Sequence, residues 1–269
     1  MSPQPTSTNR VALALEDMKE GLCSIHVWPM LGWQEIKQRY RRSALGPFWI
    51  TLSTGAMIGA MGPLYGKLLG QDFGAYLPFL GVGMIVWMLI ANLLNESCAT
   101  FTSASGYIQQ LKLPLTVHVL RTVFRNLIVF AHHLVVIAIV LFFYPPKLDW
   151  TLLLMPVGVA FIAINAVWLG ILLGLLSARF RDIPQFVGSL VPLLFFLTPV
   201  IWKPEMLGRY RWAADINPVT HFLEAVRAPL LGEPVSWQTW VALTATTIVG
   251  YTVALIAFSR FRTRIAYWV

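Results

Sequence analysis

Residues 152–176 read LLLMPVGVAFIAINAVWLGILLGLL, and none of these residues carries a charge. About 20 consecutive apolar residues are enough for a helix to cross the hydrocarbon of a bilayer. A charged side chain at the centre of such a helix would be costly, which agrees with its absence here. This stretch therefore predicts a membrane-spanning α-helix.

Five more apolar runs accompany this one, so we expect an all-α integral membrane protein with six transmembrane helices. The third run is longer than one crossing needs. His118, Arg121 and Arg125 lie in its first turns, which we expect at the membrane surface. The fifth run is short and contains Pro192 and Pro199, which favours a kinked helix. The expected spans are residues 47–69, 77–95, 116–144, 152–176, 186–202 and 239–258.

Composition supports the membrane assignment and argues against several other classes. The chain is 57% hydrophobic and 12% charged, with a mean hydropathy of +0.66. Its net charge of +8 comes from residues beside the apolar runs, where anionic lipid would attract them, so nucleic acid is not an expected partner. Cys23 and Cys98 have no metal-ligand spacing, and we expect neither a disulfide scaffold nor a metal site. The first 20 residues lack the apolar core of a signal peptide.

The distribution of basic residues predicts the orientation. With the N-terminus inside, most of the 20 Lys and Arg residues fall in cytoplasmic segments, so both termini are expected in the cytoplasm. We divide the chain into a cytoplasmic segment, residues 1–46, and a six-span domain, residues 47–269.

The cytoplasmic segment contains a candidate amphipathic helix. Trp33, Ile36, Tyr40 and Ala44 recur at helical spacing, and charged residues occupy the other faces. Such a helix lies on the membrane surface. It would anchor the chain there or dock a soluble partner, and Glu35 and Arg39 are the charged candidates for that docking.

Between the fifth and sixth spans lie two moderately apolar stretches, residues 206–213 and 221–231. Neither is long enough to cross, so we expect two short helices that rest at the outer face or dip into it. They are either a functional lid or a simple capping loop.

The chemistry that the chain lacks narrows the function. No phosphate-binding loop of the G-x-x-x-x-G-K-[ST] type occurs, so the chain is not expected to bind ATP itself. An ion-coupled carrier usually places carboxylates or basic groups within the bilayer, and spans four to six contain none. An ion-coupled secondary transporter is therefore disfavoured. Glu96 lies at the end of span two, where we expect it to pair with Arg121 or Arg125.

Three segments resemble a known family. They are WQEIKQRYRRSALGPFW at residues 33–49, ARFRDI at 178–183 and INPVTHFLEAVR at 216–227. In this order they resemble the polysaccharide-exporting branch of the ABC-2 permeases. The resemblance implies a homodimer that assembles with two copies of a separate ATPase in a bacterial inner membrane. ATP and Mg²⁺ would bind to that ATPase, no cofactor would bind to this chain, and the exported substrate would be a lipid-linked polysaccharide in contact with membrane lipid.

The resemblance also assigns roles to residues. The connection between spans two and three, residues 102–115, corresponds to a short coupling helix gripped by the ATPase, with Tyr107, Gln109, Gln110 and Lys112 as contacts. The exit would be gated by the segment that contains Asn217, Pro218, His221, Glu224 and Arg227, in which Asn217-Pro218 caps the second helix. The alternative for Glu224 and Arg227 is a plain intrahelical ion pair.

Two further sets of candidates remain open. Arg179 and Arg181 would bind a lipid pyrophosphate at the cytoplasmic entrance, or would only set the topology. A sugar polymer slides along rigid aromatic faces, so a channel lining is one role for aromatic residues in or beside the spans, and packing is the other. The aromatic candidates are Phe48, Trp49, Trp87, Trp168, Phe195, Phe196 and Trp202.

Two other functions stay open at this point. One is an ABC-2 exporter of a drug or another lipid, which would share the fold. The other is a membrane enzyme that acts on lipid-linked sugars. An enzyme would need carboxylates or a metal near a membrane face, and the cytoplasmic loops offer only Asp182 and Glu96.

Overall fold

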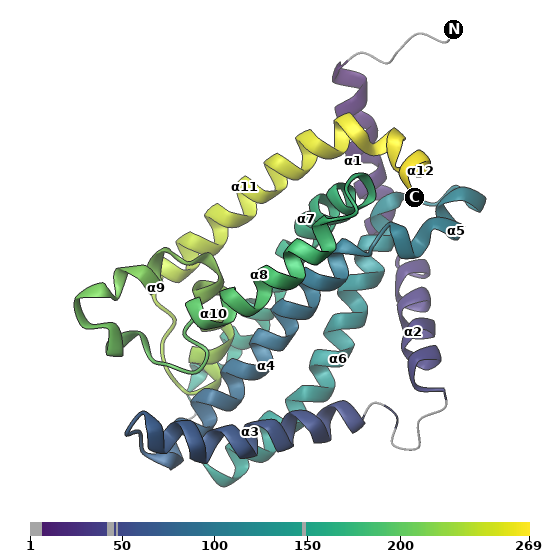
Figure 1. The fold of residues 1–269 in the computed structure, drawn as a ribbon. Coiled ribbons are helices and arrows are strands. Elements are labelled where there is room, and N and C mark those ends of the chain that lie inside the picture. The colour runs from purple at the N-terminus through teal and green to yellow at the C-terminus, as the bar shows by residue number, and fades with distance from the viewer. Residues whose placement is uncertain (1–6, 42–45, 47, 147–148) are drawn as a thin grey trace, which may run out of the picture.

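The computed structural model describes residues 7–41, 46, 48–146 and 149–269. These residues form helices and connecting turns without a strand. Figure 1 shows α1, α5 and α12 together at one end of a helix bundle, with α9 and α10 toward the other end. The expected all-α architecture is confirmed for the described residues. The division at residue 46 stays a prediction, and Arg42, Ala44 and Pro47 lie outside the described residues.

Four described helices are long and apolar enough to cross a membrane: α4 (Phe73–Cys98), α6 (Leu115–Phe143), α7 (Met155–Arg179) with the preceding η2 (Trp150–Leu154), and α11 (Trp237–Phe261). The helix α3 (Phe48–Leu68) has 21 residues, but Gly, Thr and Lys lower its hydropathy. A shorter apolar helix, α8 (Ile183–Leu197), has 15 residues. The count of six spans therefore stays a prediction that depends on α3 and α8.

The centre of the bundle is α4. Every residue from Tyr76 to Trp87 is buried, because α3, α6, α7, α8 and α10 all pack around this helix. Between α3 and α6, the Thr54 hydroxyl lies 3.3 Å from His133 Nε2, so this histidine makes an interhelical contact.

The N-terminal segment contains two helices where we expected one. Before the expected helix lies α1 (Ser7–Cys23), which packs against α6 and α11 and buries Ala14, Asp17 and Gly21. The second helix, α2 (Val27–Tyr40), packs along α6 and buries Ile36, whereas Trp33 is 46% exposed. The expected apolar face of this helix is therefore buried against the protein at Ile36 and partly exposed at Trp33.

The first turns of α6 are covered by protein. Residues Thr116 to Val123 are buried, because α1 and α2 cover them. The expectation that His118, Arg121 and Arg125 lie at the depth of the membrane surface stays a prediction.

Short helices follow both α4 and α11 at this end of the bundle. The connection from α4 to α6 contains η1 (Thr102–Ala104) and α5 (Ser105–Gln110), as expected for residues 102–115. After α11 come η4 (Arg262–Arg264) and α12 (Ile265–Trp268), which contacts α5 and α7.

At the opposite end, α8 stops at Leu197, and the buried residues Thr198, Pro199 and Val200 continue as turns. The fifth expected span, which ran to Trp202, is therefore too long at its end. The chain then forms η3 (Pro204–Tyr210), α9 (Trp212–Ile216) and α10 (Pro218–Leu230). Short helices are confirmed there, and α10 packs into the bundle against α4, α7 and α11. Their position relative to the outer face of the membrane stays a prediction.

Candidate functional site

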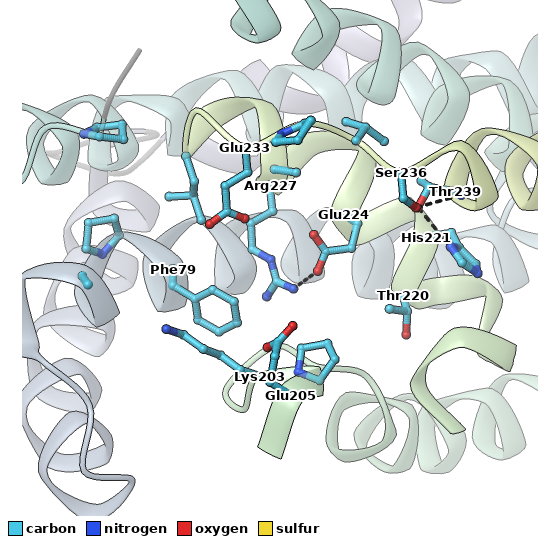
Figure 2. A pocket seen from close by; sticks show the side chains of 18 of the residues that line it. Phe79, Lys203, Glu205, Thr220, His221, Glu224, Arg227, Glu233, Ser236 and Thr239 are labelled. Carbon is cyan, nitrogen blue, oxygen red and sulfur yellow. Dashed lines mark hydrogen bonds and ion pairs between the residues drawn. The ribbon is translucent and has the colours of Figure 1, made fainter. Parts of the chain in front are cut away.

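The end of the bundle near α9 and α10 contains an open cavity of about 1730 Å³. Its walls come from the start of α4, the turn before η3, α10 and the connection to α11. Figure 2 shows charged side chains from these separate segments pointing toward one another. Among the described residues, the cavity is lined by three basic and four acidic side chains: Lys203, Arg211, Arg227, Glu205, Asp215, Glu224 and Glu233.

Arg227 holds this end of the protein together. Its side chain is 1% exposed and pairs with Glu224, as the i,i+3 spacing predicts. Its Nη1 also donates a hydrogen bond of 2.6 Å to the Pro199 carbonyl, and its guanidinium lies 4.0 Å from the Phe79 ring. Because the guanidinium is buried, removing its partner would leave an uncompensated charge and would cost more than breaking an exposed helical pair.

The start of α10 is fixed by capping and by His221. The Asn217 side chain accepts a hydrogen bond of 3.0 Å from the Val219 amide, and Pro218 follows at the first helical position. The expected capping role of Asn217-Pro218 is therefore confirmed. The His221 ring lies 2.8 Å from the Asp215 carbonyl and 3.2 Å from the Thr239 hydroxyl, so it joins α9 and α10 to α11.

Three charged groups in the cavity have no ion-pair partner in the described part of the chain: Lys203, Asp215 and Glu233. The Lys203 ammonium lies 5.5 Å from the Phe79 ring and has no carboxylate within ion-pair distance. Glu233 likewise has no basic partner within that distance. Burial raises the pKa of the Glu233 carboxyl above its ordinary value of 4.5, and nearby Glu224 raises this pKa further, while Arg227 and Lys203 lower it.

The other end of the bundle contains a network of ion pairs. Arg125 on α6 pairs with Glu96 on α4 at 2.7 Å and with Glu35 on α2. Arg121 pairs with Glu35 at 3.0 Å, and Arg39 pairs with Glu96 at 3.3 Å. The expected pairing of Glu96 is confirmed with Arg125. The network joins α2 to the two helices behind it.

This network places two candidates for partner contact. The Glu35 side chain is 29% exposed and is engaged with two arginines, so most of its hydrogen-bonding capacity is used inside the chain. Arg39 is 50% exposed and remains accessible despite its pair with Glu96.

Asp17 is the polar junction of the same end. Its carboxylate is buried and accepts hydrogen bonds from the Leu115 amide at 3.1 Å and from the Thr116 amide at 3.0 Å. The Thr116 hydroxyl and Arg262 Nε also donate to it, at 2.8 and 3.0 Å. One side chain of α1 thus caps the start of α6 and binds the end of α11.

The short helix α5 presents its polar residues outward. Tyr107 is 43% exposed, and Gln110 and Lys112 are exposed as well. Gln109 is exposed, but its side-chain amide donates a hydrogen bond of 2.9 Å to the Val269 carbonyl. The structure therefore brings the four expected contacts to one short segment and ties it to the C-terminal residues.

The aromatic candidates fall into two groups. Trp87 is buried and lies 5.5 Å from the Phe195 ring, while Trp168 donates to Asn165 at 2.7 Å and covers Gly250 of α11. These positions are explained by packing. Phe48, Trp49 and Phe196 are 59–68% exposed, and Trp202 donates a hydrogen bond to the Phe196 carbonyl.

Arg179 and Arg181 lie at the exposed end of α7. The Arg179 guanidinium is 5.3 Å from the Trp268 ring of α12 and 5.8 Å from the Phe180 ring. Arg181 is exposed one residue beyond Phe180.

Sequence reasoning missed three groups in these clusters: Asp17, Lys203 and Glu233. Asp17 is one charged residue in a polar N-terminal segment, and nothing local distinguishes it from its neighbour Glu16. Lys203 and Glu233 lie just outside the apolar runs and the 216–227 segment. Only the folding of the chain brings them to the cavity.

Comparisons with known proteins find matches over most of the chain. The profile of a family described as "ABC-2 type transporter" matches residues 27–231. Two proteins from Klebsiella pneumoniae, both named "O-antigen export system permease protein RfbA", are 24% and 23% identical over 240 residues, which is 87% of this chain and 91% of each relative. A protein of the same name from Myxococcus xanthus is 25% identical over 169 residues, or 63% of this chain and 65% of the relative.

Proposed function

Because the chain belongs to the ABC-2 type transporter family, as a multi-pass membrane permease rather than an enzyme, we propose that it exports a lipid-linked polysaccharide of the O-antigen kind. The observation that carries this proposal is the match over nearly the whole chain to relatives named as O-antigen export permeases. The export would run from the cytoplasm to the periplasm of a bacterium.

In this proposal the energy comes from a partner. A homodimer of the chain assembles with two copies of an ATPase subunit, which bind ATP and Mg²⁺. The exposed positions of Tyr107, Gln110 and Lys112 on and after α5 support a docking role for this helix, and Arg39 of α2 extends the same surface. The hydrogen bond from Gln109 of α5 to Val269, and the contact of α5 with α12, would transmit force from the ATPase to the C-terminal helices.

The proposal includes six spans, of which α3 and α8 complete the four long ones. The basic residues favour a cytoplasmic position for the end with α1, α5 and α12. Arg179 and Arg181 would then meet the lipid pyrophosphate at the entrance, and the α9–α10 end would form the exit gate. The exposed rings of Phe48, Trp49 and Phe196 are the aromatic candidates that remain open to polymer or lipid.

The test is reconstitution in lipid, alone and with the ATPase encoded nearest to the chain, followed by native mass and ATP hydrolysis. We expect a two-to-two complex that hydrolyses ATP, and no hydrolysis by this chain alone. Export is then measured as surface polysaccharide in cells that lack their own permease. A complex that assembles but restores no surface polymer would contradict the assigned cargo, and turnover of a lipid-linked sugar by the chain alone would indicate an enzyme.

A further inference from the structure

The cavity between α4, α10 and the η3 turn has a composition that the gate role alone does not explain. A gate needs a joint that opens, and Arg227 with Glu224, Pro199 and Phe79 supplies one. It does not need Lys203, Asp215 and Glu233, which line the same cavity without ion-pair partners in the described chain. Asp215 and Glu233 are exposed and Lys203 is partly exposed, so their polar groups are available to a ligand in the cavity.

The size and the charge balance limit what could satisfy these groups. The cavity measures about 1730 Å³, whereas pockets for single drug-sized ligands measure about 300–1,000 Å³. The three basic and four acidic side chains among the described residues that line it nearly cancel. An acidic polymer would meet an excess of carboxylates, so an uncharged ligand longer than one unit fits best.

The hydrogen-bonding groups favour hydroxyls. A hydroxyl both donates and accepts, so a ligand rich in hydroxyls can donate to Glu233 and accept from Lys203. The Thr220 hydroxyl lines the same cavity and has no partner among the described residues. At the cavity wall, Trp237 is 76% exposed and Phe143 is 68% exposed, and the apolar C–H face of a sugar ring packs on such rings.

We propose that this cavity binds consecutive sugar units of an uncharged glycan, with the Lys203 ammonium and the Glu233 carboxylate as the hydrogen-bonding groups. The inference rests on the proposed function and deepens it. It places a sugar-binding subsite at the gate and specifies that the exported glycan is uncharged. Figure 2 shows Lys203 and Glu233 in the same cavity as Phe79 and Arg227. A bound glycan would therefore touch the segment that Arg227 holds in place.

The test uses the full chain in lipid nanodiscs and a ligand-observed saturation-transfer NMR titration. The probes are short neutral oligomers of glucose, mannose and galactose, with an oligomer of galacturonic acid as the acidic counterpart. We expect a neutral oligomer to bind more tightly than the acidic one. Lys203→Ala and Glu233→Gln should each weaken its binding about tenfold, the loss expected for a hydrogen bond to a charged group.

Matched controls separate this subsite from general effects. Lys67→Ala and Glu20→Gln change exposed residues outside the cavity lining and should leave binding unchanged. The thermal midpoint of each variant checks folding, and the two cavity variants are independent of one another. No binding of any neutral oligomer, a preference for the acidic oligomer, or equal binding by wild type and both folded cavity variants would overturn the proposal.

The two proposals fail in different ways. If the ATPase complex assembles and exports polymer while the cavity variants bind as wild type does, only the subsite is wrong. If no ATPase binds, the proposed function fails whatever the titration gives.

Discussion

The guanidinium of Arg125 on α6 lies 2.7 Å from the carboxylate of Glu96 on α4, and the Arg125 side chain is only 14% exposed. Asn126 also donates to the same carboxylate oxygen, at 2.6 Å. Glu96 therefore satisfies two donors from neighbouring positions on one helix.

Removing this carboxylate should destabilise the protein. Glu96→Gln leaves Arg125 with Glu35 alone, and we expect a loss of about 2 kcal/mol, the usual scale for hydrogen bonds to a charged group. The measurement is thermal unfolding in lipid nanodiscs. Arg39→Gln is the control, because this arginine is 50% exposed and its pair with Glu96 should contribute less than about 1 kcal/mol. Equal midpoints for wild type and Glu96→Gln would show that the pair adds no stability.

Replacing Asp17 should destabilise the protein more than replacing an exposed neighbour on α1. Asp17→Ala removes the cap of α6 and the partner of Arg262, and breaking a buried charge pair costs about 3 kcal/mol. Hydrogen–deuterium exchange should speed up at residues 115–119. Glu16→Ala on the exposed face of α1 is the matched control. Protection at α6 that is the same in both variants would argue against the junction.

The packing of α7 on α10 predicts that Gly158 tolerates no side chain. An added Cβ would lie 2.3 Å from the Ala225 carbonyl oxygen, so the two helices must separate. We expect Gly158→Ala to cost about 1–3 kcal/mol. Gly188→Ala, where nothing lies within 4 Å of the added atom, should cost less. The measurement is the thermal midpoint of each variant. A lower midpoint for Gly158→Ala than for Gly188→Ala would support the close packing of α7 on α10, and equal midpoints would contradict it.

The outer face of α3 is the candidate dimer contact. The sequence shows small residues there, and Gly62 and Gly55 turn out to face the protein interior, whereas Ala56, Gly59 and Ala60 are exposed. Small residues let two membrane helices approach closely. Gly59→Leu should therefore shift native mass toward the monomer, and Thr252→Leu on the exposed side of α11 should not. An unchanged mass for Gly59→Leu would refute the role of this face.

The raised pKa of Glu233 predicts a pH dependence of stability. As the pH rises above 4.5, the unfolded chain releases this proton before the folded chain does, so the folded state loses stability until the pH passes the raised pKa. Glu233→Gln should remove this part of the slope. Thermal midpoints measured across this acidic range test it, and identical slopes in wild type and variant would contradict it.

Much of the fold could be predicted because the apolar runs carry it locally. The runs at 77–95, 116–144, 152–176 and 239–258 each became a long helix. Within residues 216–227, Asn217 and Pro218 predicted the capped start of a helix, which the structure shows as the start of α10. These signals depend on residues next to one another in the chain.

The rest depends on contacts between distant segments. Hydropathy alone did not show which helices α10 packs against, and its buried face is supplied by α4, α7 and α11. The covering of the start of α6 was missed for the same reason, because α1 carries only a short stripe of Ala14, Asp17 and Gly21 to cover it. The position of Glu96 predicted an arginine partner, but it did not predict that Glu35 would pair with the same arginine, Arg125.

The Asp17 junction also sets an order of events during synthesis. Its carboxylate binds an arginine that lies 245 positions later, so the ribosome must finish the last membrane helix before this contact can form. Until then, the amides at the start of α6 have Asp17 as their cap, but α1 is not held from the side of α11. The segment after α11 thus holds the earlier-made α1 in place, and a chain that stalls before Arg262 would leave this end of the protein open to quality-control proteases.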